Sequence, residues 1–151
     1  MNPTKHPVDD SLGEAEVHEV APPGAGNEWS YHVEAGTRVK IISVGYYCQA
    51  GATVAIRRHS VVFNSSNVGG YVITDMVMTD GVAANKNLWL WWFLGLGRPY
   101  AETPNQLFCY GTLPDLILEH PGYIYCQTQN RPAGEDTYTN IRLKLLKWRL
   151  E

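Results

Sequence analysis

The run from Leu88 to Leu94, Leu-Trp-Leu-Trp-Trp-Phe-Leu, constrains the fold of this chain more than any other stretch. Side chains alternate between the two faces of a strand, so this run would place leucines and one tryptophan on one face and Trp89, Trp91 and Phe93 on the other. Both faces are apolar, whereas a strand in an antiparallel sheet usually shows water one polar face. We therefore expect two coverings. One is the second sheet of the domain, and the other is a neighbouring subunit, a ligand or a long loop of the same chain.

Length and charge exclude several classes of protein. The 151 residues suffice for one domain with a sizeable core. A net charge of -3 and a pI near 5.9 give no electrostatic reason to expect a nucleic acid as partner. No apolar run approaches the roughly 18 residues of a membrane span, and the N-terminus lacks the apolar core of a secretory signal. We expect a protein that folds in a cytosol, without a membrane partner.

Residues 1–27 differ in composition from the remainder and are predicted to form a flexible acidic arm. They hold five acidic residues and one lysine, a net charge of -4, whereas the ten acids and eleven bases that follow give +1. The arm has four prolines and no aromatic residue, so it cannot build a core of its own. It is either a frayed terminus or an arm that becomes ordered on a partner. In the second case the expected contact residues are Val17, Val20, Pro22 and Pro23.

A capping box predicts local structure within this arm. Ser11 is followed three residues later by Glu14, which indicates a short helix over residues 11–20. Ten residues are too few for a helix that is stable without docking on something else.

Residues 28–151 read as a single all-β domain. Eight or nine short alternating runs are separated by turn residues, and no helical period extends over eleven residues, which indicates a β-sandwich or barrel. Alternation changes phase at Leu145-Leu146, so Trp148 and Leu150 continue on the face that held Arg142. This change predicts either a bulge or a surface covered by a neighbour. We group Trp148 and Leu150 with Trp89, Trp91 and Phe93 as the expected subunit interface.

The chain offers no constellation for catalysis or metal binding. Its five histidines lack the spacing of a metal site, and it has no nucleophile elbow, phosphate loop or dinucleotide fingerprint. Three cysteines, Cys48, Cys109 and Cys126, have no paired spacing and lie beside apolar or aromatic residues. They are expected to be small buried side chains, with a bond between subunits as the alternative. We predict neither an enzyme nor a cofactor.

Charge appears on both faces of one predicted strand, at Arg57-Arg58-His59. Either this strand lies near a sheet edge, where inward charge discourages unwanted pairing, or its arginines pair with carboxylates of a neighbouring subunit.

Carbohydrate binding is the main functional rival to assembly. Tryptophan and tyrosine rings on a β-sandwich can stack on sugar rings, and this chain has five Trp and nine Tyr. The Trp-rich run is too apolar for a wet groove. Tyr100, Tyr110 and Tyr138 lie near predicted turns and are the better candidates for glycan stacking.

The last third of the chain contains three connected motifs. They are Leu-Pro-Asp-Leu-Ile-Leu at residues 113–118, Pro-Gly-Tyr-Ile at residues 121–124, and the Ala-Gly-Glu-Asp turn at residues 133–136 with the strand that follows it. This succession resembles small jelly-roll virion proteins of tailed bacteriophages. A second piece, Trp29 through Val39, contains a matching Ala-Gly-Thr-Arg turn into a long strand. Together the two pieces cover about half of the 151 residues.

This resemblance implies a jelly-roll-like antiparallel β-sandwich of about eight strands in a structural component of a virion, made in the host cytoplasm. The expected role is a capsid decoration or cement protein that binds the major capsid protein or another virion protein. A neck, collar or tail accessory protein and a virion module that adsorbs to glycans are the alternatives. We expect a homo-oligomer, with a trimer favoured.

Overall fold

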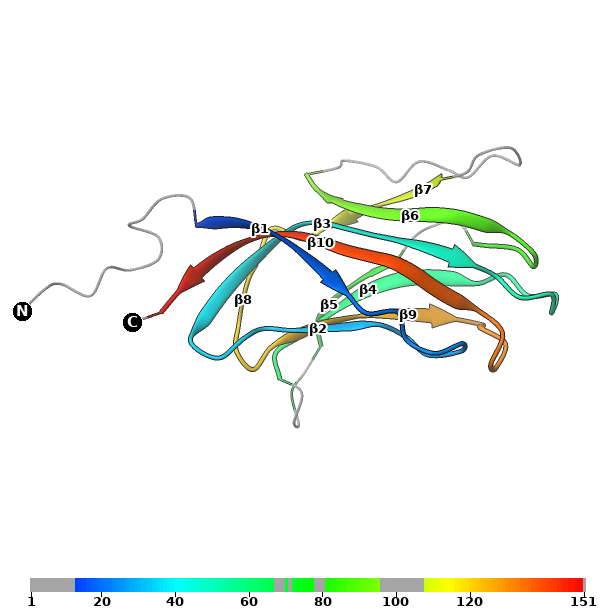
Figure 1. Ribbon diagram of the computed structural model, residues 1–151, viewed down its shortest axis with the longest axis horizontal. Helices are drawn as coiled ribbons and strands as arrows, with labels where there is room; N and C mark the ends of the chain where they lie inside the picture. The colour runs from blue at the N-terminus through cyan, green and yellow to red at the C-terminus, as the bar shows by residue number, and fades with distance from the viewer. Residues whose placement is uncertain (1–12, 67–69, 71, 78–80, 96–107, 151) are drawn as a thin grey trace, which may run out of the picture.

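The chain folds into β-strands throughout the part that the structure describes, which is residues 13–66, 70, 72–77, 81–95 and 108–150 of a computed structural model (Figure 1). The strands are β1 (Glu14–Val20), β2 (Ser30–His32), β3 (Thr37–Gln49), β4 (Arg58–Asn64), β5 (Val72–Val77), β6 (Asn87–Leu94), β7 (Phe108–Leu113), β8 (Ile117–Glu119), β9 (Tyr123–Gln129) and β10 (Thr137–Arg149). Within those ranges no helix is long and apolar enough to span a membrane.

The strands form two sheets that face each other (Figure 1). Sheet A has the order β1-β10-β3-β6-β7, with β8 also paired to β3, and sheet B has the order β2-β9-β4-β5. All named pairs are antiparallel except β6 and β7, which run parallel. The predicted all-β sandwich is therefore confirmed.

The core lies between the two sheets and is built around the ring of Tyr46 on β3. Tyr46 is fully buried, with the ring centroid of Trp29 at 5.6 Å and that of Trp92 at 5.5 Å. Such aromatic pairs contribute packing beyond their buried area. Trp92 also joins the sheets, since its Nε1 donates a hydrogen bond to the Met76 carbonyl oxygen of β5 at 3.3 Å.

The change of phase in the last strand is an irregularity of pairing. The register between β10 and β3 shifts between Lys144 and Leu145. Leu143 and Leu145 remain buried on either side of the shift. Of the two explanations left open by the sequence, the local irregularity is present in the structure.

The acidic segment contributes a strand, so the helix expected over residues 11–20 is wrong. β1 pairs with β10 from Glu14 opposite Lys147 to Val20 opposite Ile141. A capping box is a local signal, and here a seven-residue ladder with the basic strand β10 outweighs it. Residues 1–12 lie outside the described ranges.

The strand with charges on both faces is an interior strand, so the edge explanation is wrong. β4 pairs with β5 on one side and with β9 on the other. Arg57, just before β4, pairs instead with Asp136 of the same chain, and both side chains are fully buried.

Candidate interaction face

The outer surface of sheet A, which faces away from the core, carries a row of aromatic side chains from β3, β6 and β7. The alternation predicted for β6 is correct, because Leu88, Leu90 and Trp92 are buried in the core. Their neighbours Trp89, Trp91 and Phe93 are half-buried and lie on the other face. Tyr47 of β3 and Tyr110 of β7 extend the row at its two ends. We call these five residues the aromatic row.

The rings of the aromatic row contact one another in sequence. Tyr47 and Trp89 have ring centroids 5.3 Å apart, and Trp89 and Trp91 are 5.9 Å apart with their planes at 20°. The step from Trp91 to Phe93 is again 5.9 Å at 14°, and Phe93 is 6.1 Å from Tyr110. Nearly parallel planes at this separation correspond to offset stacking. The five side chains therefore form one continuous apolar surface.

Gly45 explains how Trp91 lies on the sheet. The two residues are Cα partners on β3 and β6. A Cβ atom placed on Gly45 would lie 2.1, 2.2 and 2.5 Å from three atoms of the six-membered ring of Trp91. Similar distances to three ring atoms mean that the missing side chain would meet the face of the ring. The indole thus covers the glycine backbone, and its opposite face points away from sheet A.

The aromatic row is suited to binding rather than to reaction. Its rings hold no acid, base or nucleophile, apart from the phenol groups of the two tyrosines. Half-buried aromatic side chains grouped on one surface are typical of the central part of protein interfaces. Flat rings on the surface of a sheet can also stack on sugar rings.

Two residues predicted for the same interface lie elsewhere on sheet A. Trp148 is the Cα partner of Arg38, whereas Phe93 is that of Ser43. Five residues of β3 separate these positions, which corresponds to about 16 Å at roughly 3.3 Å per residue. Leu150 follows at the end of the chain, where its N–H donates to the Gly36 carbonyl at 2.7 Å. The structure therefore does not bring Trp148 and Leu150 together with the aromatic row.

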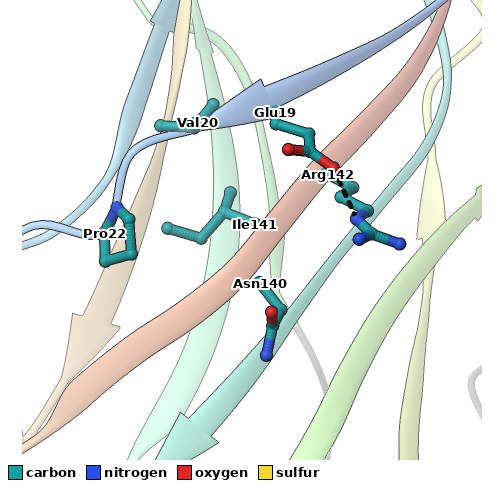
Figure 2. Close-up of a pocket in the computed structure, with 6 residues that line it drawn as sticks. All are labelled: Glu19, Val20, Pro22, Asn140, Ile141 and Arg142. Carbon is teal, nitrogen blue, oxygen red and sulfur yellow. Dashed lines mark ion pairs between the residues drawn. The ribbon is translucent and has the colours of Figure 1, made fainter.

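The four residues predicted to bind a partner through the arm have different environments. Val17 is 63% exposed, and Pro22 is also exposed. Val20 packs against the core and Pro23 is half-buried, so Val17 and Pro22 are the two that present exposed side chains. Val20 and Pro22 line a small cavity beside β10 (Figure 2).

The three tyrosines predicted to stack on glycans also have different environments. Tyr110 belongs to the aromatic row. Tyr138 is 1% exposed and its hydroxyl is 2.6 Å from Thr128 Oγ1, so its assignment to a glycan site is wrong. The alternation of β10 turns Tyr138 into the core even though it lies near the start of the strand. Tyr100 is outside the described residues.

A second ring stack, which sequence reasoning missed, lies on the outer face of sheet B. His32 and Tyr123 have ring centroids 4.9 Å apart with planes at 8°, and Tyr123 and Tyr125 are 5.5 Å apart. The alternation of Tyr123 and Tyr125 with buried Ile124 and Cys126 is the signal that would have predicted it.

Sequence reasoning also missed a buried polar cluster around His59. Tyr46 Oη lies 3.0 Å from His59 Nδ1 and 3.2 Å from Cys126 Sγ, and Cys48 Sγ lies 3.9 Å from His59 Nε2. Burial lowers the pKa of His59 to about 3 and raises that of the Cys126 thiol to about 12. The tautomer of the neutral imidazole decides which of Tyr46 Oη and His59 Nδ1 donates this hydrogen bond. The cluster holds a neutral histidine and protonated thiol in the core.

Neither thiol of this cluster is poised for chemistry. Cys48 and Cys126 are buried and form no disulfide bond, as expected for small core side chains. Among the described residues, no group of three or more His, Cys, Asp and Glu side chains is arranged to hold a metal ion. The side chain of Cys109 is not among those described.

Two comparisons with known proteins found no relative of this chain. No protein-family model matches the chain, and a search of curated proteins gave no significant match.

Proposed function

We propose that this chain is a structural subunit of a virion that decorates the head of a tailed bacteriophage. In this proposal the aromatic row binds another copy of the chain or another virion protein, such as the major capsid protein. The observation that carries the proposal is the continuous apolar surface formed by Tyr47, Trp89, Trp91, Phe93 and Tyr110 on the outside of sheet A. The resemblance of the last third of the chain to small virion proteins supports it independently.

The size of the aromatic row is appropriate for the centre of an interface. Buried Phe, Tyr and Trp side chains each account for roughly 150–250 Å². Five half-buried rings therefore leave only part of that area still to be covered, whereas a stable interface buries about 800 Å² on each partner. Apolar burial drives such association at about 25 cal/mol per Å², and flanking polar residues would supply the rest of the contact.

The expected assembly is a homo-oligomer, and we favour a trimer. In a closed ring of copies each aromatic row would meet the next subunit, so that no apolar edge remains free. A place in the neck, collar or tail would use the same surface.

Solution mass measured by light scattering tests the association. We expect the full chain to form a defined oligomer and Trp91→Ser to shift it toward monomers. Val54→Ser is the matched control, because Val54 is 92% exposed and lies outside the aromatic row. A full chain that is monomeric at high concentration contradicts self-association through this surface.

Binding to heads tests the role in the virion. Phage heads assembled without this chain should bind the purified protein in co-sedimentation, and Trp91→Ser should reduce the bound amount more than Val54→Ser does. Equal sedimentation with and without heads would contradict a decoration role.

Glycan adsorption is the second candidate, and it is favoured by one observation. The outer face of Trp91 points away from sheet A, since its other face covers Gly45, and stacked rings of this kind can bind sugars. A glycan array probed with the full chain and with Trp91→Ser distinguishes this function. Glycan binding that is lost in the variant, by a protein that stays monomeric, would replace the assembly proposal.

A further inference from the structure

Strand β1 is held on the edge of β10 by complementary charge. β1 carries three glutamates, and the facing strand carries Arg142, Lys144, Lys147 and Arg149. Glu19 Oε1 lies 3.2 Å from Arg142 Nε, and Glu16 Oε2 lies 3.5 Å from Lys147 Nζ. A ladder of seven residue pairs joins the two backbones. The edge of β10 is thus a receptor for an acidic extended segment.

Outside this ladder, β1 has few attachments to the rest of the molecule. Val17 is 63% exposed, and the Arg142–Glu19 pair has side chains 57% and 71% exposed. Exposed ion pairs of this kind stabilise weakly. Val20 packs against the core, and the ring of His18 lies 4.9 Å from that of Tyr31. Most of the binding of β1 therefore comes from contacts that any copy of β10 would offer.

The segment that links β1 to the domain has the character of a hinge. The next fixed point after Val20 is Gly26, whose N–H donates to the Asp136 carbonyl at 2.8 Å. Residues 21–25 between them include Pro22 and Pro23. A residue before proline prefers an extended backbone, so Ala21 and Pro22 are both biased toward an open path. Five residues reach roughly 17 Å when extended, which allows β1 to leave its own domain.

A cavity lies where β1 departs from β10. It has a volume of about 150 Å³ and is lined by Glu19, Val20, Pro22, Asn140, Ile141 and Arg142 (Figure 2). This cavity opens to solvent, and the exposed Pro22 of the hinge lies on its wall.

We infer that β1 is an exchangeable strand, and that in assembled copies the edge of β10 receives Glu14–Val20 of a second copy of this chain. Exchange preserves every β1–β10 contact and changes only the path of residues 21–25. Short hinge loops favour this kind of swap between identical domains. The inference does not use the aromatic row, so the two associations can succeed or fail separately.

Cysteine pairing between two differently tagged full-length chains tests the exchange. Val17 and Lys144 are Cα partners, and both side chains are exposed. Val17→Cys in one chain and Lys144→Cys in the other would therefore come within disulfide range only if β1 crosses between copies. The chains are unfolded together under reducing conditions, refolded as a mixture and oxidised. We expect a tagged heterodimer on a non-reducing gel, several-fold above the control.

The control pairs Val17→Cys with Gln127→Cys, which is exposed on β9 of the other sheet and reports random collision. The double variant Val17→Cys/Lys144→Cys in one chain shows that the pair can close. The exchange is overturned if the heterodimer is no more abundant than in the control while the double variant forms its disulfide only within single chains. If the double variant forms no disulfide either within a chain or between chains, the pairing of Val17 with Lys144 is itself wrong. The variant Pro22→Gly/Pro23→Gly should lower the exchanged fraction several-fold, because it removes the preference of the hinge for an extended backbone.

Discussion

Arg57 and Asp136 form a fully buried ion pair, with Arg57 Nε donating to Asp136 Oδ2 at 2.7 Å. The pair is also hydrogen-bonded to the backbone around it. Arg57 Nη2 donates to the carbonyls of Gly51 and Thr53 at 3.3 and 3.2 Å, and the Gly51 N–H donates to Asp136 Oδ1 at 2.9 Å. These bonds tie the loop before β4 to the turn before β10. Two buried charges are tolerated there because their hydrogen-bonding groups are satisfied.

Removing one member of this pair should lower the free energy of unfolding of the protein. Asp136→Ala leaves the Arg57 guanidinium buried without its counter-charge, which costs about 3–5 kcal/mol of the free energy of unfolding. Urea denaturation followed by tryptophan fluorescence measures the loss. Glu135→Gln is the control, because Glu135 is the adjacent acidic residue but is exposed, and a glutamine keeps an oxygen that accepts from Thr53. If both variants unfold at the same urea concentration, the ion pair is not what holds this loop.

A methyl group beneath Trp91 should disturb the aromatic row without touching the core. In Gly45→Ala the new Cβ would lie 2.1 Å from Trp91 Cζ3, so the indole must lift off the sheet. Overpacking of this kind costs about 1–3 kcal/mol, and here it should also weaken the exciton signal of the stacked tryptophans in circular dichroism. Ser43→Ala, two residues away on the same face of β3, serves as control. An unchanged tryptophan signal in Gly45→Ala would mean that the ring does not rest on the glycine.

The strand that could be predicted best from sequence is β6, and the reason is physical. Leu88, Leu90 and Trp92 follow a period of two over a continuous apolar run, and burial of alternate side chains requires that pattern. β1 could not be predicted in the same way. Its Glu-Ala-Glu-Val-His-Glu-Val sequence has no apolar face, and it becomes a strand through pairing with the basic edge of β10, more than a hundred residues away.

Only part of the aromatic row could be predicted, because alternation along one strand does not show which residues of the neighbouring strands lie beside it. Trp89, Trp91 and Phe93 were found from alternation alone, whereas Tyr47 and Tyr110 join the row only through the pairing of β3 and β7 with β6. The change of phase at Leu145-Leu146 led us to group Trp148 with them, but the register of β10 places it near the other end of β3. The register between strands that are far apart in the chain could not be predicted from the sequence, and this register decides which side chains lie together.

The buried imidazole of His59 should make the fold sensitive to mild acid. Its pKa falls from 6.5 to about 3 in the folded protein, chiefly because burial disfavours the charged ring. Between these values the unfolded chain binds a proton that the folded chain does not, so stability rises with pH. The stabilising contribution is complete above pH 6.5 and is lost as the pH falls from 6.5 toward 3. The expected slope is about 1.4 kcal/mol per pH unit.

Urea denaturation at a series of pH values between the ordinary titration ranges of histidine and of the carboxylates measures this slope. In that interval the acidic side chains are still ionised, so the dependence reports histidines, and His18, His32 and His120 are at least partly exposed. His59→Gln removes the titrating group while keeping a polar side chain beside Tyr46 and Cys48. We expect the variant to be less stable at neutral pH but to have a much flatter dependence on pH. A slope that persists in His59→Gln would assign the acid sensitivity to another group and would leave His59 with only a packing role.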